Sequence, residues 1–177
     1  MKYVAITVIG IIALWLLFYF SIFAPIINQD KTVSVTSSLE LSVPPGMWPY
    51  KSPIFRFFFF YPDDLKIKEY AGGSDTTITF DNAKTGRGFQ IFIVPYAEDH
   101  ITPEQFKKDL PSGVMENPVE ILIDGTKAMM FYSKNAAMGD MREVWFIKNS
   151  FLYEVTTYRE LDSWLSSIMQ TWQFLEI

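Results

Sequence analysis

The chain has 177 residues, of which 49% are hydrophobic and 17% are aromatic, and its formal net charge is −5. This length supports one domain with a real hydrophobic core and excludes two ordinary domains. The acidic balance repels phosphate backbones, so nucleic acid is not expected as a partner, and the lack of cysteine excludes a lipoprotein anchor.

The N-terminus predicts a membrane anchor over residues 1–24. Tyr3 to Ala24 contains no charged residue, and as a helix it would be about 33 Å long, enough to cross a bilayer core of about 30 Å. The alternative is a cleaved signal peptide, but the apolar stretch exceeds the usual length of such a segment and Pro25 follows the best cleavage position. We therefore expect a single-pass protein that contacts the membrane through residues 3–24.

The charges around this span favour one orientation. Lys2 precedes the apolar stretch, whereas Asp30 and Lys31 follow it, a slight bias toward a cytoplasmic N-terminus. We expect a protein of the cell membrane with its folded domain on the extracytoplasmic side. Without Lys2 the remaining chain has 14 basic and 20 acidic side chains, a net charge of −6.

The sequence predicts a tether over residues 25–50 and the folded domain over residues 51–177. The tether mixes Ser, Thr, Pro and Gly with little helical periodicity. Trp48 and Tyr50, on either side of Pro49, are expected to dock onto the edge of the domain.

The first half of the domain predicts four strands, at residues 55–61, 66–70, 76–81 and 89–96. In the first of these, FRFFFFY, side chains alternate between two faces, so phenylalanines lie on both. This pattern favours a strand covered on both sides; a patch facing a partner and contact with lipid are the alternatives.

A helix and then four further strands are expected next. Thr102 to Gln105 forms a capping box with proline at the first helical position. The strands are predicted at residues 119–123, 127–133, 141–147 and 151–158, with the Asp124-Gly125 pair as a tight hairpin turn. A last helix is expected from Glu160 to Trp172. The order predicts an α+β domain, an antiparallel sheet flanked by helices.

Six short motifs, in this order along the chain, resemble the PsbP-like family over roughly Ile54 to Leu175. They are Tyr61-Pro62-Asp63, Ile91-Phe92-Ile93-Val94, Ile123-Asp124-Gly125, Trp145-Phe146-Ile147, Leu152-Tyr153-Glu154-Val155 and Trp172-Gln173-Phe174. The resemblance implies an antiparallel sheet flanked by helices. In photosynthetic members this domain is an extrinsic, lumen-side subunit that stabilises a large membrane complex. The anchor and the single histidine of this chain depart from that type.

No residue pattern predicts catalysis, a metal or a cofactor. His100 is expected in a solvated loop, because structural zinc takes four Cys or His ligands. Counting outward from the turn at Asn149-Ser150 pairs Trp145 with Glu154, and it places Glu143 and Glu154 on one face of the sheet. A carboxylate pair for glycoside chemistry and a solvated sheet face are the two interpretations. We expect the protein not to be an enzyme; a hydrolase is the weakest hypothesis.

The leading hypothesis is therefore an accessory or scaffolding domain that contacts a membrane-associated protein complex. Its expected contact surface is an aromatic patch of Trp48, Tyr50, Phe58 and Trp145. The alternative is a binder of a small hydrophobic ligand, held in a cleft between the sheet and a helix.

Overall fold

The structure is a computed structural model that describes residues 43–110, 113–135 and 139–175. These residues belong to one compact unit, Leu41–Ile177. The predicted anchor and residues 25–42 of the predicted tether lie outside the described residues. Among the helices that are described, none combines the length and the apolar character that a membrane crossing requires.

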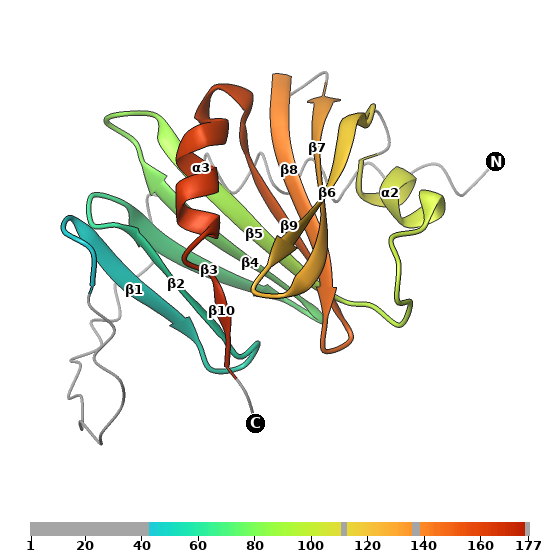
Figure 1. Ribbon diagram of the computed structural model, residues 1–177, viewed down its shortest axis with the longest axis horizontal. Helices are drawn as coiled ribbons and strands as arrows, with labels where there is room; N and C mark the ends of the chain where they lie inside the picture. The colour runs from blue at the N-terminus through green and yellow to red at the C-terminus, as the bar shows by residue number, and fades with distance from the viewer. Residues whose placement is uncertain (1–42, 111–112, 136–138, 176–177) are drawn as a thin grey trace. The chain divides into compact units, whose positions relative to one another are not determined.

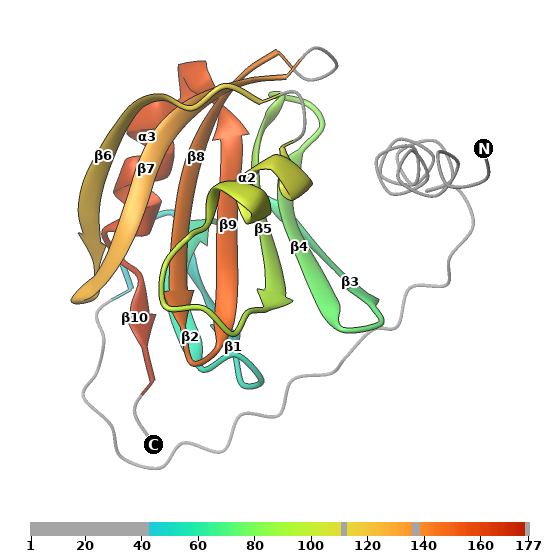
Figure 2. The same ribbon diagram turned by 90° about the vertical axis from the view of Figure 1, so that its right-hand side faces the viewer.

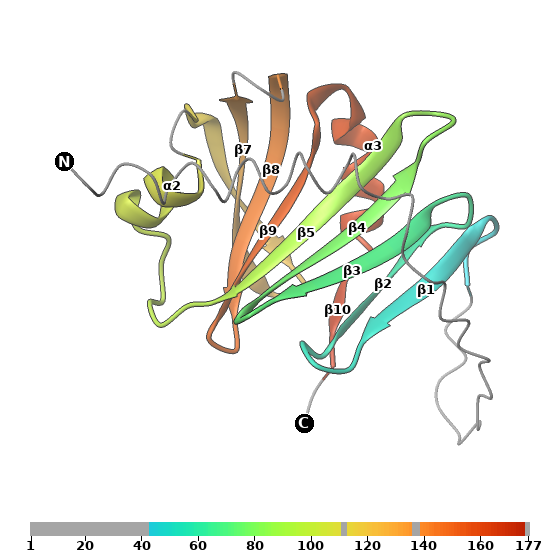
Figure 3. The ribbon, with the colours of Figure 1, turned by 180° about the vertical axis from the view of Figure 1, so that it is seen from behind.

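Seven antiparallel strands form the main sheet, in the order β3-β4-β5-β9-β8-β7-β6 (Figures 1 and 3). All consecutive neighbours except β5 and β9 are joined by hairpins. The strands are β3 (Lys66–Gly72), β4 (Asp75–Asn82), β5 (Arg87–Pro95), β6 (Glu116–Ile123), β7 (Thr126–Asn135), β8 (Gly139–Lys148) and β9 (Phe151–Tyr158). The predicted strands of this sheet are confirmed, with ends that differ by a few residues.

A second, three-stranded sheet has the order β1-β2-β10. Its strands are β1 (Met47–Ser52), β2 (Phe57–Pro62) and β10 (Gln173–Phe174), and β2 pairs antiparallel with both neighbours. Residues 47–50, which the sequence placed in the tether, are thus part of a strand of the folded domain.

The helices are short. Within the described residues they are α2 (Pro103–Asp109) and α3 (Asp162–Met169), and a 3-10 turn at Arg159–Leu161 precedes α3. The last helix therefore ends at Met169 and not at Trp172, because the backbone leaves the helix through a turn at Gln170 and Thr171. The antiparallel sheet is confirmed, whereas flanking by helices is only a small part of the architecture.

Two tight turns fix the register of the β6–β7 and β8–β9 hairpins. Asp124 and Gly125 have φ angles of 45° and 73°, and Asn149 and Ser150 have 53° and 61°. Positive φ at both central residues is typical of the two-residue hairpin turn that matches strand twist. The resulting register pairs Trp145 with Glu154 and Glu143 with Thr156, as the sequence predicted.

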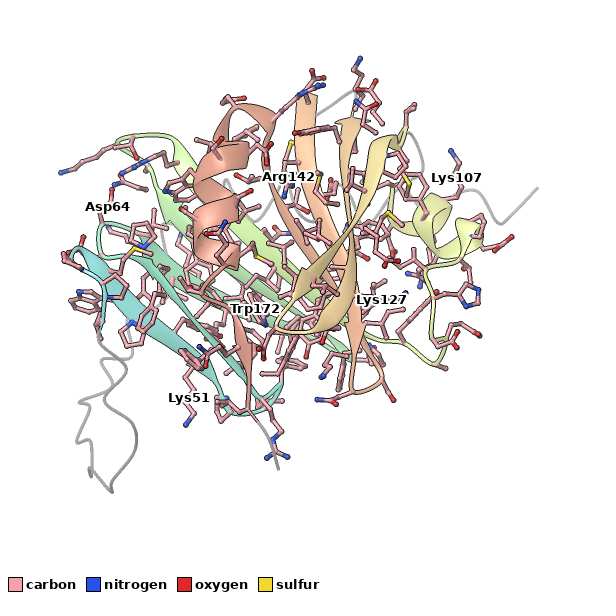
Figure 4. The ribbon with its side chains drawn as sticks, viewed as in Figure 1. Lys51, Asp64, Lys107, Lys127, Arg142 and Trp172 are labelled. Atoms are coloured by element: carbon pink, nitrogen blue, oxygen red, sulfur yellow. The ribbon has the colours of Figure 1, made fainter. Side chains whose placement is uncertain are left out.

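The main core lies between the two sheets and α3 (Figure 1). Phe57 and Phe59 of β2 are fully buried there and stack on Trp172, with ring centroids 4.4 and 5.0 Å away. Trp172 follows α3 and is labelled in Figure 4. The second sheet thus supplies much of the cover that the sequence assigned to helices.

The phenylalanine run of β2 is mostly core. Phe57, Phe59 and Tyr61 face the seven-stranded sheet as one set. On the other face of β2, Phe60 is also buried, while Phe58 is half-buried and makes an edge contact with Phe60. A strand with phenylalanine covered on both faces is confirmed.

Candidate functional site

The other face of the seven-stranded sheet carries a separate, smaller apolar cluster under α2. Phe131, Trp145 and Leu152 come from three adjacent strands, and Phe106 of α2 packs on them. Figure 2 shows α2 crossing in front of the sheet, on the face opposite α3. We call this surface, with its covering helix, the α2 face.

Local sequence explains where α2 begins and how it lies on the sheet. The Thr102 hydroxyl accepts a hydrogen bond from the Gln105 backbone N–H at 3.1 Å, and Pro103 occupies the first turn. Phe106 is the single buried residue of the helix. Its ring centroid is 5.6 Å from that of Phe131 and 5.7 Å from that of Trp145. This aromatic trio is the apolar attachment of α2.

A cleft of about 700 Å³ lies between the α2 segment and strands β6 to β8. Its lining is mainly apolar and includes Ile101, Phe106, Met115, Met129, Trp145 and Ile147. A mostly apolar cleft with a few polar groups is typical of small-molecule sites. The sequence predicted such a cleft only as an alternative, without its residues.

Two ion pairs lie at the polar part of this cleft. His100 Nδ1 is 2.8 Å from an Asp99 carboxylate oxygen, and Lys127 Nζ is 3.4 Å from one of Glu120. The hydrogen bond between Asp99 and His100 raises the pKa of His100 and lowers that of Asp99. Both pairs are well exposed, so each contributes little to stability. His100 is thus solvated, as expected, but it belongs to a cleft that the sequence did not indicate.

Glu143 is buried on the α2 face and accepts three hydrogen bonds. Ser133 donates to Oε1 at 2.9 Å, and Thr156 and Trp145 donate to Oε2 at 2.7 and 3.3 Å. Burial raises the pKa of Glu143, and these three donors oppose that rise. The carboxyl group is therefore a satisfied buried acceptor.

Glu154 lies on the neighbouring strand and is less completely satisfied. It is 8% exposed, and its Oε1 has no hydrogen-bond partner. Burial raises its pKa well above the usual value, and the nearby carboxyl groups of Asp109 and Glu143 raise it further. Two glutamates of one sheet face thus have different surroundings, and neither lines the cleft. Their burial is at odds with the expectation of a solvated sheet face.

A third polar group lies at the start of α3. Arg142, labelled in Figure 4, is buried and pairs with Asp162, which also accepts a 2.6 Å hydrogen bond from the Tyr132 hydroxyl. Arg159 lies over the ring of Tyr132 at 4.4 Å. The acidic group occupies the first turn of α3, so this cluster anchors the helix to β7 and β8.

The four residues of the predicted aromatic patch do not share one surface. Trp48 is 60% exposed and Phe58 is half-buried. Tyr50 is buried in the main core against Phe80, and Trp145 is fully buried on the α2 face. The prediction that Tyr50 and Trp145 contribute to an exposed patch is therefore wrong. A strand places alternate side chains inward, and both residues occupy inward positions.

No group of three or more His, Asp or Glu side chains suited to a metal ion occurs in the described part of the chain. The two buried glutamates of the α2 face are instead held by different surroundings: Glu143 accepts hydrogen bonds from Ser133, Trp145 and Thr156, whereas Glu154 Oε1 has no hydrogen-bond partner.

The fold is similar to that of a solved structure, the solution structure of cyanobacterial PsbP (CyanoP) from Synechocystis sp. PCC 6803. The TM-score is 0.56 at 9% sequence identity, and the match covers 79% of this chain and 98% of that chain. No family model and no curated protein matches the sequence. At this identity the likeness establishes the fold alone, and the expected PsbP-like fold is confirmed at that level.

Proposed function

We propose that this domain is a non-enzymatic accessory or scaffolding module, tethered to the cell membrane, that contacts a membrane-associated protein complex. The observation that supports the proposal is the PsbP-like fold, found over 79% of the chain. The described polar groups also favour binding over catalysis, because the buried acids lie under α2 and not in the open cleft.

The contact surface that we propose is centred on Trp48. Its side chain is 60% exposed on β1, an edge strand of the small sheet. Large aromatic side chains are enriched among the residues that contribute most to protein interfaces. Phe58, on the adjacent strand, is half-buried and pairs with Lys51, so it lies on the opposite face of the small sheet from Trp48, which pairs with Tyr61. It is therefore not part of the proposed surface.

The test is quantitative co-purification of the tagged full-length protein after gentle detergent extraction. The wild type is compared with a chain carrying an unrelated membrane anchor and with Trp48→Ser. Tyr70→Ser is the matched control, since Tyr70 is an exposed aromatic residue on an edge strand of the other sheet. We expect the same partners with both anchors and their loss with Trp48→Ser only. Partners that disappear with the anchor swap would make the N-terminal segment the recognition element and contradict the proposal.

The cleft on the α2 face supports a second candidate, a binder of a small hydrophobic ligand. Its volume of about 700 Å³ falls in the range of small-molecule sites, and its lining is mainly apolar. Organic extraction of the purified protein followed by mass spectrometry should then recover a stoichiometric compound. Met129→Trp would fill the cleft and abolish recovery, whereas Val119→Trp, at an exposed position outside the lining, would not. Equal recovery from both variants would exclude the cleft as the site.

A further inference from the structure

The attachment of α2 to the sheet rests on two contacts of different chemistry. One is apolar, the Phe106 ring on Phe131 and Trp145. The other is polar: the carboxyl group of Asp109, in the last turn of α2, is close enough to Glu154 of β9 to raise the pKa of Glu154. The helix has only seven residues, so it depends on these tertiary contacts and not on its own propensity.

Charged side chains from α2 and from β8 surround the Glu154 carboxyl group. Asp109 and Lys108 face it from α2, and Glu143 faces it from β8, whereas its pairing partner on β5 is the uncharged Phe92. Of the charged groups, two are acidic and one is basic, and the basic group, Lys108, is exposed to water. Burial and the carboxyl groups of Asp109 and Glu143 together favour the protonated form of Glu154 and raise its pKa well above the usual value.

We propose that α2 is a pH-released cover of the sheet, docked while the Glu154 carboxyl group is protonated and released when that proton leaves. In the docked state the protonated carboxyl group donates its hydrogen bond to Asp109. Loss of the proton leaves Glu154 as a buried carboxylate near the carboxyl groups of Asp109 and Glu143, with its Oε1 lacking a hydrogen-bond partner and Lys108 as the compensating charge. Release of α2 exposes the carboxylate to water and removes Asp109 from it.

The sign of the effect follows from proton linkage. In the released state Glu154 is exposed and ionises near the usual carboxyl pKa of about 4.3, whereas the docked state keeps the proton to higher pH. Docking is therefore strongest in acid. It weakens as the pH rises between these two pKa values, and it becomes constant again above the docked value. With one proton involved, the docking equilibrium changes by at most about tenfold per pH unit.

Release would also change the cleft. Phe106 lines the cleft as well as holding the helix, so movement of α2 removes one of its walls. The proposal does not require that the cleft takes a ligand, or that the domain has the partner proposed above.

The test is hydrogen exchange of the full-length protein, followed by mass spectrometry, between about pH 5 and about pH 9, a range above the pKa of a free carboxyl group. Protection factors, corrected for the intrinsic exchange rate at each pH, are compared for peptides of α2 and for peptides of β8 and β9. The Phe106 and Leu110 amides report on α2, since their hydrogen bonds to Thr102 and Phe106 carbonyls close its two turns. The strands serve as the internal reference for global stability.

In the wild type we expect α2 protection to fall with rising pH, by up to about tenfold per unit, while the strands stay protected. Glu154→Gln should abolish this dependence and keep α2 protected at alkaline pH, because an uncharged amide donates to Asp109 at every pH. Glu104→Gln is the matched control: it removes an exposed carboxylate from the same helix, away from Glu154, and should retain the wild-type slope.

A wild-type α2 whose protection does not change with pH would overturn the proposal. So would a Glu154→Gln protein that keeps the wild-type slope, because another group would then control the helix. If Glu154→Gln loses protection in β8 and β9 as well, Asp109→Asn provides the second measurement. This variant removes the negative charge of the half-buried Asp109 from α2 without altering the sheet, so it should raise the protection of α2 at alkaline pH. Unchanged or lower protection would also refute the proposal that α2 is a pH-released cover.

Discussion

Replacing Phe57 by alanine tests the arrangement of the two sheets around the main core. Phe57 is fully buried, its ring stacks on Trp172 at 4.4 Å, and it contacts Tyr153 at 5.9 Å. Removing a buried phenylalanine side chain loses about 1.5 to 3 kcal/mol of transfer free energy. The cavity and the lost ring contacts increase this cost, so we expect the free energy of unfolding to fall by about 3 to 5 kcal/mol.

The matched control is Phe58→Ala, the same change one position along the strand. Phe58 is half-buried on the outer face of β2, and its ring contact at 5.9 Å is with Phe60. We expect a cost below about 1.5 kcal/mol, because part of the ring already contacts water. Urea unfolding of the purified full-length protein, followed by tryptophan fluorescence, gives both values at an unchanged m-value. Equal losses in the free energy of unfolding for the two variants would refute the assignment of Phe57 to the core and of Phe58 to the half-buried outer face of β2.

Three further substitutions test separate features of the structure. Arg142→Ala should lower the free energy of unfolding by about 3 kcal/mol in the same assay, since it leaves the partly buried Asp162 without its cation. Gly88→Ala should cost about 1 to 3 kcal/mol, because the new Cβ would lie 2.6 Å from the Phe80 carbonyl oxygen; an unchanged unfolding midpoint would show that the strand yields freely. Thr102→Ala should cost about 1 kcal/mol of α2 capping, visible as faster exchange of the α2 amides without a change in the strands.

The strands of the main sheet could be predicted because their signals are local. The Asp124-Gly125 turn needs positive φ at both positions, and it has φ angles of 45° and 73°. The strand β10 was missed because its partner, β2, lies far away in the sequence. The strand β1 pairs with β2 across a short connection, so distance does not explain why it was assigned to the tether. Pro49 within β1 argues against a strand, but proline is tolerated on an edge strand such as this one.

The candidate site was predictable only in part. The hairpin register placed Glu143 and Glu154 on one face, and the structure confirms the pairing. No local pattern indicated that α2 returns to cover that face, because the packing of Phe106 on Phe131 and Trp145 joins residues that are far apart in the sequence. The same long-range packing buries Trp145, whose ring was expected at a partner surface.

The burial of Trp145 changes what the accessory-domain hypothesis requires. Its indole N–H donates to Glu143 at 3.3 Å, so the ring belongs to an internal polar network and is not available to a partner. With Tyr50 also buried, Trp48 is the member of the predicted patch that is mainly exposed. Interfaces commonly depend on a few large anchoring residues, so a single exposed tryptophan is sufficient as the centre of a contact. The hypothesis now rests on one position, and Trp48→Ser tests it without disturbing the core, whereas replacing the buried Tyr50 or Trp145 would also destabilise the fold.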